Sequence, residues 1–248
     1  SWQSLKHNFA GPMLGALMGA VLLAVLGMRD PYALVSLSLC VFVTGALAME
    51  FDRGTRARQR STNESYGIAF YRLVAKSRRR YGGYLVHLAM LLLFVGFTGK
   101  AFTTEQEFVL VRGESTQIKD YTVTYEALAQ TQDANKQVTA AALSLFQSGD
   151  FLGTLLPARH HYPSFDQGTT EVSIYSRLRE DFYLILVGWN EDDGSAKFQV
   201  YINPLVNGVW AGGIVFVLGA LWSMWPTPRD RRLAELDRRV LGYLQEED

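Results

Sequence analysis

The feature that most constrains the fold is an apolar run from Tyr81 to Gly99, which directly follows the basic cluster Arg78–Arg80. A helix rises about 1.5 Å per residue and a bilayer core is about 30 Å thick, so a run of roughly 20 such residues predicts a transmembrane helix. Apart from its tyrosines, the run has one ionisable side chain, His87. Because an unpaired polar group is costly inside a membrane, His87 is expected to face a partner, a cavity or a metal.

The neighbours of His87 on a helix indicate what it could face. Gly83 lies four positions before it, and Met90, Leu91 and Phe94 follow at three, four and seven positions. These residues share one helix face, which then carries a gap, an imidazole and a soft apolar floor. A flat porphyrin needs all three features, whereas a small metal ion does not need the floor. A histidine hydrogen-bonded to a neighbouring helix is the alternative.

Apolar residues are concentrated in four blocks, at about 10–28, 33–51, 82–99 and 204–225. Three blocks lack Asp, Glu, Lys and Arg, and the block from 33 has only Glu50, at its edge. One long polar stretch separates the last two blocks. This pattern predicts an α-helical membrane protein with four transmembrane helices and an inserted extracytoplasmic antiparallel β domain. The lone Cys40 excludes an intrachain disulfide.

Basic residues determine the predicted topology. Residues 52–80 and the tail after Pro226 are rich in arginine, which places both in the cytoplasm. Residues 66–74 predict a short amphipathic helix, which lies on the membrane surface or packs on the helical bundle. The expected segments are two transmembrane helices within 1–51, the basic cytoplasmic segment 52–80, a transmembrane helix at 81–101, the β domain at 102–203, a transmembrane helix at 204–225 and a cytoplasmic tail at 226–248.

The polar insert predicts β-structure, because its apolar runs are short, rich in β-branched and aromatic residues, and bounded by turn residues. Such runs suggest a small antiparallel barrel or sandwich of six or seven strands. The candidate strands are 107–111, 121–125, 138–145, 171–175, 183–187 and 198–202. The expected core residues are Val109, Val111, Val123, Tyr125, Leu143, Leu145, Ile174, Leu184, Leu186 and Val200.

No catalytic residue can be named from the insert, since Ser173 and Ser176 lack the sequence context of an activated serine. His160 and His161 suggest a metal site, but adjacent residues on a strand point to opposite faces. A metal site would also need a recognisable cluster of further ligands. We therefore expect a solvated pair of histidines in a loop.

Four stretches of the chain together resemble the C-terminal part of the CcmF family, membrane heme lyases of cytochrome c maturation. They are Arg78–Leu88 (RRRYGGYLVHL), Phe94–Glu105 (FVGFTGKAFTTE), Arg112–Ser115 (RGES) with Asp120–Val123 (DYTV), and Tyr201–Val206 (YINPLV) before a Trp-bearing helix. The resemblance extends in order over essentially the whole chain. The start at Ser1 is expected to be the interior of a longer chain, a processed product or a trimmed form.

The resemblance implies a role in attaching reduced heme to apocytochrome c, through thioether bonds between heme vinyls and Cys-x-x-Cys-His thiols. It also implies a heme b (iron protoporphyrin IX) whose iron is ligated by His87, the expected metal ligand, and which relays electrons to the substrate heme. The other candidate heme-binding residues are Gly83 and Met90, which border the imidazole, and Arg80 and Tyr84, which are placed to contact propionates. Interfacial anchoring is the alternative for the last two.

The identity of the second axial ligand of the iron stays open. Met90 lies three residues from His87 on the same helix face, so the ligand on the opposite side of the iron must come from another helix. His7 is the candidate within this chain. The other candidate is a histidine from the N-terminal portion of the same protein or from a companion subunit.

The resemblance further implies a bacterial inner membrane protein with its β domain on the periplasmic side. The expected partners are the N-terminal portion or companion subunit, other cytochrome c maturation proteins, apocytochrome c, heme and the lipid bilayer, with no nucleic acid. The family's Trp-rich heme-cradling segment is absent from this sequence, so whether the chain is an enzyme by itself stays open. A non-catalytic membrane scaffold whose β domain docks partners is the alternative function. A transporter is disfavoured, because the spans lack paired charges and broken-helix signals.

Overall fold

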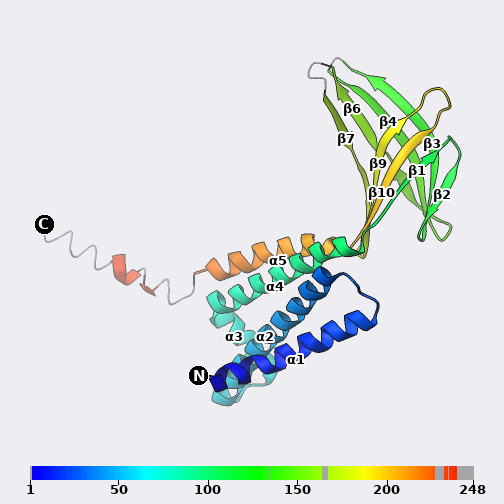
Figure 1. The fold of residues 1–248 in the computed structure, drawn as a ribbon. Helices are drawn as coiled ribbons and strands as arrows, with labels where there is room; N and C mark the ends of the chain where they lie inside the picture. The colour runs from blue at the N-terminus through cyan, green and yellow to red at the C-terminus, as the bar shows by residue number, and fades with distance from the viewer. Residues whose placement is uncertain (1, 134, 164–166, 227–231, 234, 239–248) are drawn as a thin grey trace. The chain divides into compact units, whose positions relative to one another are not determined.

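The structure is a computed structural model that describes residues 2–133, 135–163, 167–226, 232–233 and 235–238. Side chains are not described for residues 1–5 and His7. The chain divides into a helical unit, Ser1–Thr98 with Gly208–Asp248, and a β unit, Gly99–Asn207 (Figure 1). Most of the predicted tail, 226–248, lies outside the described residues.

Among the described residues, the helical unit contains four helices that are long and apolar enough to cross a membrane, α1, α2, α4 and α5. Together with the antiparallel β unit, they confirm the predicted fold class. The helices are α1 (Trp2–Val25), α2 (Pro31–Thr62), α3 (Tyr66–Lys76), α4 (Arg78–Thr98) and α5 (Asn207–Met224).

Helix α2 is longer than its apolar block. It begins at the N-cap Asp30, whose carboxylate accepts a hydrogen bond from the Ala33 backbone N–H at 2.7 Å. It continues past Phe51, where the apolar block ends, to Thr62. Hydropathy marks the membrane segment rather than the helix end, because arginine and glutamine are also good helix formers. The helix ends where Asn63 adopts a left-handed conformation, with φ of 51°.

Helix α3 forms where the amphipathic helix was predicted. The ring of its Phe70 lies 5.8 Å from the ring of Phe51 in α2. Glu64, which precedes α3, pairs with Arg58 at 3.1 Å and also with Arg72 of α3. Helix α3 therefore contacts α2, and its place relative to the membrane surface stays a prediction.

Helices α4 and α5 approach each other closely at glycines on both helices (Figure 1). A methyl group at Gly96 of α4 would lie 2.6 Å from Val209 Cγ2, and one at Gly212 of α5 would lie 2.9 Å from the Ala89 carbonyl oxygen. Small residues of this kind allow the backbones of transmembrane helices to come close. The contact determines which side of α4 is left for other interactions.

The β unit begins with a short 3₁₀ helix, η1 (Gly99–Phe102), and its described strands form two antiparallel sheets. The first sheet has the order β1 (Thr104–Leu110), β10 (Ala196–Pro204), β9 (Glu180–Trp189) and β8 (Ser173–Ser176). The second has the order β2 (Ser115–Ile118), β3 (Tyr121–Gln132), β4 (Gln137–Gln147), β6 (Ala158–Tyr162) and β7 (Gln167–Glu171), with β5 (Asp150–Leu155) paired to β4.

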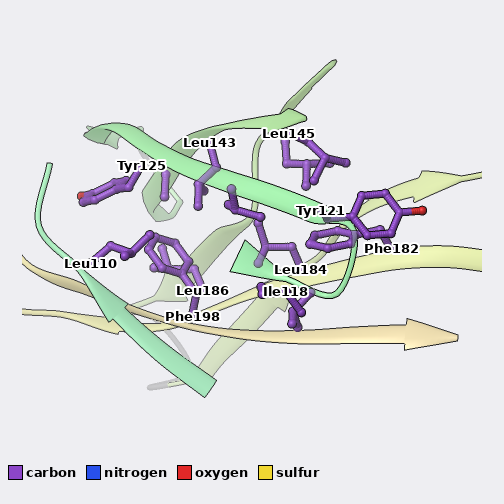
Figure 2. Close-up of a cluster of buried hydrophobic side chains, with 14 of the residues drawn as sticks. Leu110, Ile118, Tyr121, Tyr125, Leu143, Leu145, Phe182, Leu184, Leu186 and Phe198 are labelled. Atoms are coloured by element: carbon purple, nitrogen blue, oxygen red, sulfur yellow. The ribbon is translucent and has the colours of Figure 1, made fainter. Parts of the chain in front are cut away.

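The core of the β unit consists of inward-facing side chains from both sheets (Figure 2). Seven of the ten predicted core residues are buried: Val123, Tyr125, Leu143, Leu145, Leu184, Leu186 and Val200. The prediction is wrong for Val109, Val111 and Ile174, which are 58%, 44% and 48% exposed. In β1 it is Leu110, 5% exposed, that faces the core, so Val109 lies on the other face of the strand, and Val111 follows the strand's end.

Candidate functional site

One face of α4 is left partly uncovered by the other described helices of its unit. A methyl group at Gly83 would meet no atom within 4 Å, His87 is exposed, and Met90 and Phe94 remain 40% and 51% exposed. Leu91, predicted to be part of this face, is instead only 8% exposed. Its position is rotated by about 40° from that of His87, since each residue advances a helix by about 100°. We call Gly83, His87, Met90 and Phe94 the open face of α4.

The imidazole of His87 is oriented by its own helix. Its Nδ1 lies 2.8 Å from the carbonyl oxygen of Gly83. A carbonyl can only accept, so Nδ1 carries the proton, and the lone pair of the neutral ring is on Nε2. A metal-binding histidine commonly shows this arrangement, in which a hydrogen bond to one nitrogen prepares the other as a ligand.

The sequence left open a histidine that is hydrogen-bonded to a neighbouring helix. Among the described residues, the hydrogen bond of His87 goes to Gly83 of the same helix. The side chain is also exposed rather than packed between helices. Within the described part of this chain, the histidine is therefore available to a group that approaches the open face.

Arg80 and Tyr84 lie one turn apart toward the N-terminal end of α4 and share a partner that the sequence did not reveal. The Arg80 guanidinium donates to Glu50 of α2 at 2.7 Å and, through Nε, to the Tyr84 hydroxyl at 2.9 Å. The Tyr84 hydroxyl donates to the same Glu50 oxygen at 3.1 Å. The only signal for this partner was that Glu50 is the one acidic residue at the edge of an apolar block.

An aromatic cluster supports this hydrogen-bonded group. The Phe51 ring lies 5.1 Å from the Tyr81 ring and 5.6 Å from the Tyr84 ring, and the two tyrosine rings meet edge to face at 5.6 Å. Tyr81 is 3% exposed, so the cluster is packed between α2 and α4. Edge-to-face pairs at this spacing are favourable, and they restrict the orientation of Tyr84.

His160 and His161 lie on strand β6 rather than in a loop, so that prediction is wrong. Their side chains point to opposite faces of the strand, as adjacent strand residues must. The Nδ1 atom of His160 lies 3.9 Å from a carboxylate oxygen of Glu171 on β7. No group of three or more His, Cys, Asp or Glu side chains able to hold a metal ion occurs among the described residues. Within the described ranges, neither histidine belongs to a metal-binding cluster.

Residues 101–204 match a family model described as the CcmF C-terminal β-sandwich. The cytochrome c-type biogenesis protein ccl1 of Rhodobacter capsulatus is 27% identical over 171 residues, which are 68% of this chain and 26% of that protein. CcmF of Escherichia coli is 24% identical over 61% of this chain and 23% of its own length. CycK of Rhizobium meliloti is 24% identical over 92% of this chain and 32% of its own length.

A solved structure of "Cytochrome c Heme Lyase CcmF" has the same fold. It superposes with a TM-score of 0.67 and 20% sequence identity, over 88% of this chain and 34% of that chain. The chain thus spans about a quarter to a third of the length of the relatives that it matches.

Proposed function

This chain is similar in sequence and fold to the C-terminal portion of CcmF proteins, and from that premise we propose that it forms the corresponding part of a cytochrome c heme lyase. In this role it acts with an N-terminal portion or companion subunit in a bacterial inner membrane, with its β unit on the periplasmic side. Apocytochrome c, heme and other maturation proteins are the partners. The reaction is the formation of thioether bonds between cysteine thiols and the vinyl groups of reduced heme.

We further propose that His87 is an axial ligand of a heme b bound at the open face of α4. The observation that carries this proposal is the 2.8 Å contact between His87 Nδ1 and the Gly83 carbonyl, which leaves the Nε2 lone pair for iron. The absence of a side chain at Gly83 leaves room beside the imidazole, and Met90 and Phe94 offer apolar contact to a porphyrin. When bound, such a heme supplies electrons that keep the substrate heme reduced.

The second axial ligand has to approach the open face from outside α4. The side chain of His7 lies outside the described residues. We therefore propose a histidine of the N-terminal portion or companion subunit for this position, with His7 as the alternative within the chain.

Arg80 and Tyr84 are less available to a propionate than the sequence implied, because both are already hydrogen-bonded to Glu50. A propionate that approached Arg80 would meet a guanidinium already paired with Glu50, so it would have to share or displace that carboxylate. We propose that Arg80 and Tyr84 contact a propionate from within this hydrogen-bonded group, with Glu50 aligning both donors.

The test is to replace His87 in the membrane complex that contains this chain. His87→Ala should abolish low-spin heme b absorbance and cytochrome c maturation while membrane expression stays near normal, because the His87 side chain is exposed and its hydrogen bond is to its own helix. His87→Gly with added imidazole should restore part of both signals, since free imidazole fits the vacated space and ligates iron. His160→Ala and His161→Ala are the matched controls and should change neither signal.

Full heme content in the His87→Ala complex would refute ligation by His87. Normal maturation without heme b would instead support the alternative, a non-catalytic scaffold. Loss of expression in both His87 variants would show that the histidine is needed for folding, which also contradicts the proposal.

A further inference from the structure

The turn between β8 and β9 presents a leucine to solvent between two arginines. It consists of Arg177, Leu178 and Arg179, and we call it the leucine turn. Leu178 is 91% exposed, more than any other large apolar side chain among the described residues, and both arginines are exposed as well. Single exposed leucines are common on protein surfaces, so the role of this turn depends on where the chain holds it.

Two hydrogen bonds hold the leucine turn beside the start of an apolar span. On one side of Leu178, the Arg179 carbonyl accepts a hydrogen bond from the Leu205 backbone N–H at 3.1 Å. On the other side, the Arg177 carbonyl accepts one from the side-chain amide of Asn207. Asn207 is the last residue of the β unit and the first residue of α5, where the span begins. The leucine turn therefore lies within hydrogen-bonding distance of the point where the chain enters this span.

The residues on either side of Asn207 have the character of a membrane–water interface. Trp210, in the first turn of α5, is exposed, and tryptophan is enriched where a span meets the headgroups. Leu205, which follows β10, is a second exposed apolar residue and has φ of 62°. This conformation is costly for a residue other than glycine and persists only where the surrounding structure imposes it. The segment that receives the leucine turn is therefore held in one conformation.

The leucine turn itself is also fixed, so Leu178 is exposed on an ordered backbone. The Arg177 backbone N–H donates to the Glu180 carbonyl at 3.0 Å, which closes the turn. The Arg177 guanidinium donates to Gln147 and lies 5.7 Å from the centre of the Tyr175 ring. A side chain on a fixed backbone loses less conformational entropy on binding than one on a mobile loop. Leu178 is thus prepared for contact with an apolar environment.

The solvent-facing charge of the turn is positive. Of the acidic residues that follow it, Glu180 accepts a hydrogen bond from the Tyr121 hydroxyl at 2.9 Å, and Asp181 is only 9% exposed. An apolar side chain flanked by guanidinium groups fits a lipid surface, where the apolar group enters the acyl region and the cations meet phosphates. Because the Arg177 guanidinium is engaged by Gln147, Arg179 is the residue placed for a phosphate.

We propose that the leucine turn anchors the β unit to the lipid bilayer. Leu178 enters the acyl region of the adjacent leaflet, and Arg179 donates hydrogen bonds to lipid phosphates. Lipid is the occupant because the turn is bonded to the first residue of a span, so the anchor is continuous with the membrane surface of α5. The proposal rests on α5 crossing the membrane and is independent of heme b at α4.

The test measures whether position 178 lies in lipid. It uses the full chain with Cys40→Ala, reconstituted in vesicles of phosphatidylethanolamine and phosphatidylglycerol, with a nitroxide spin label on Leu178→Cys. Electron paramagnetic resonance gives the collision rates of the label with oxygen, which concentrates in hydrocarbon, and with a water-soluble nickel complex. The ratio of the oxygen rate to the nickel rate should be at least about tenfold higher at position 178 than at a control position in water.

Val109→Cys, labelled in the same background, is the matched control. Val109 is also an exposed apolar residue of the first sheet. Strand register places it level with Gly188, near the other end of β9 from the leucine turn. At about 3.3 Å per residue this is roughly 25 Å away along the strand, so the Val109 label should be reached freely by nickel.

A second variant tests the phosphate contact. In the chain labelled at position 178, Arg179→Gln should lower the ratio of oxygen to nickel rates at least about twofold, because the turn loses its charge-assisted hydrogen bonds to phosphate. Arg112→Gln should leave the ratio unchanged. Arg112 is the matched control because it is also an exposed arginine of the β unit, but it donates within that unit, to the Glu126 carbonyl at 2.8 Å.

The proposal is overturned if nickel reaches position 178 as freely as position 109, since the turn would then lie in water. Low collision rates with both reagents would mean that protein covers the turn, either a second copy or a partner, and would overturn it too. An unchanged ratio in Arg179→Gln would refute the phosphate contact. Failure of the Leu178→Cys chain to insert would mean that the leucine is needed for folding, which contradicts its role as an exposed anchor.

Discussion

Two adjacent glycines of α5 give a direct test of how α4 is positioned. A methyl group at Gly212 would lie 2.9 Å from the carbonyl oxygen of Ala89 and from two atoms of Leu93. A methyl group at the next residue, Gly213, would meet no atom within 4 Å. Gly212→Ala should therefore push α4 and α5 apart, whereas Gly213→Ala should not.

The expected difference in the free energy of unfolding follows from this geometry. Moving the contacts from 2.9 Å to an ordinary separation of 3.4 Å requires a shift of about 0.5 Å, which forfeits roughly a quarter of the dispersion energy at the displaced atoms. Overpacking of this kind costs about 1–3 kcal/mol. Replacing glycine by alanine also favours the helix by about 1 kcal/mol, but this gain is common to both variants and cancels in their difference. Gly212→Ala should thus be about 1–3 kcal/mol less stable than Gly213→Ala.

Reversible unfolding of the full chain in bicelles, measured side by side for both variants, gives this difference. The heme b signal proposed for the membrane complex supplies a second readout, because a shift of α4 moves the open face. Equal stabilities within about 0.5 kcal/mol would refute the close packing of α4 on α5, since no other described contact separates the two variants.

Two further predictions concern topology and pH. Reporter fusions at Gln59 and Arg238 should be cytoplasmic and one at Gln147 external, because residues 52–80 and the tail are basic; an external reporter at Gln59 would contradict the orientation. Burial, and next the hydrogen bond to Glu180, raises the pKa of Tyr121 to about 12. The folded state therefore holds this proton above the unfolded pKa of about 10, so its stabilising contribution is present below pH 10 and is lost toward pH 12. Stability measured against pH should fall less steeply in this interval for Tyr121→Phe, and parallel curves would contradict the assignment.

The sequence predicted the buried face of a strand correctly where apolar and polar residues alternate along it. In β3 the apolar residues Val123 and Tyr125 alternate with threonines, and both predicted inward positions are buried. The run Phe108–Val111, which ends one residue after β1, is apolar throughout, so alternation cannot tell which face is inward. The wrong choice of face moved every predicted core side chain of that strand to the surface.

Strands β6 and β7 were missed for a different reason. Their residues are mostly polar, and β7 is exposed along its whole length, so neither strand has an apolar face that a periodicity could reveal. Gly168, of a residue type that is common in turns, lies within β7, opposite His161. Pairing with the long strand β4 holds β6 in the sheet, and that pairing is a long-range property.

The candidate site likewise contains one contact that is local in sequence and one that is long-range. His87 and Gly83 are four residues apart, so helix geometry alone places the imidazole beside the carbonyl that orients it. Glu50 is thirty residues from Arg80, and only the packing of α2 on α4 brings them to 2.7 Å. The ion pair has a consequence for the heme proposal. Because Glu50 already balances the charge of Arg80, a propionate gains less from this arginine than from an unpaired one, and the His87–iron bond has to supply most of the specific attachment that this chain contributes.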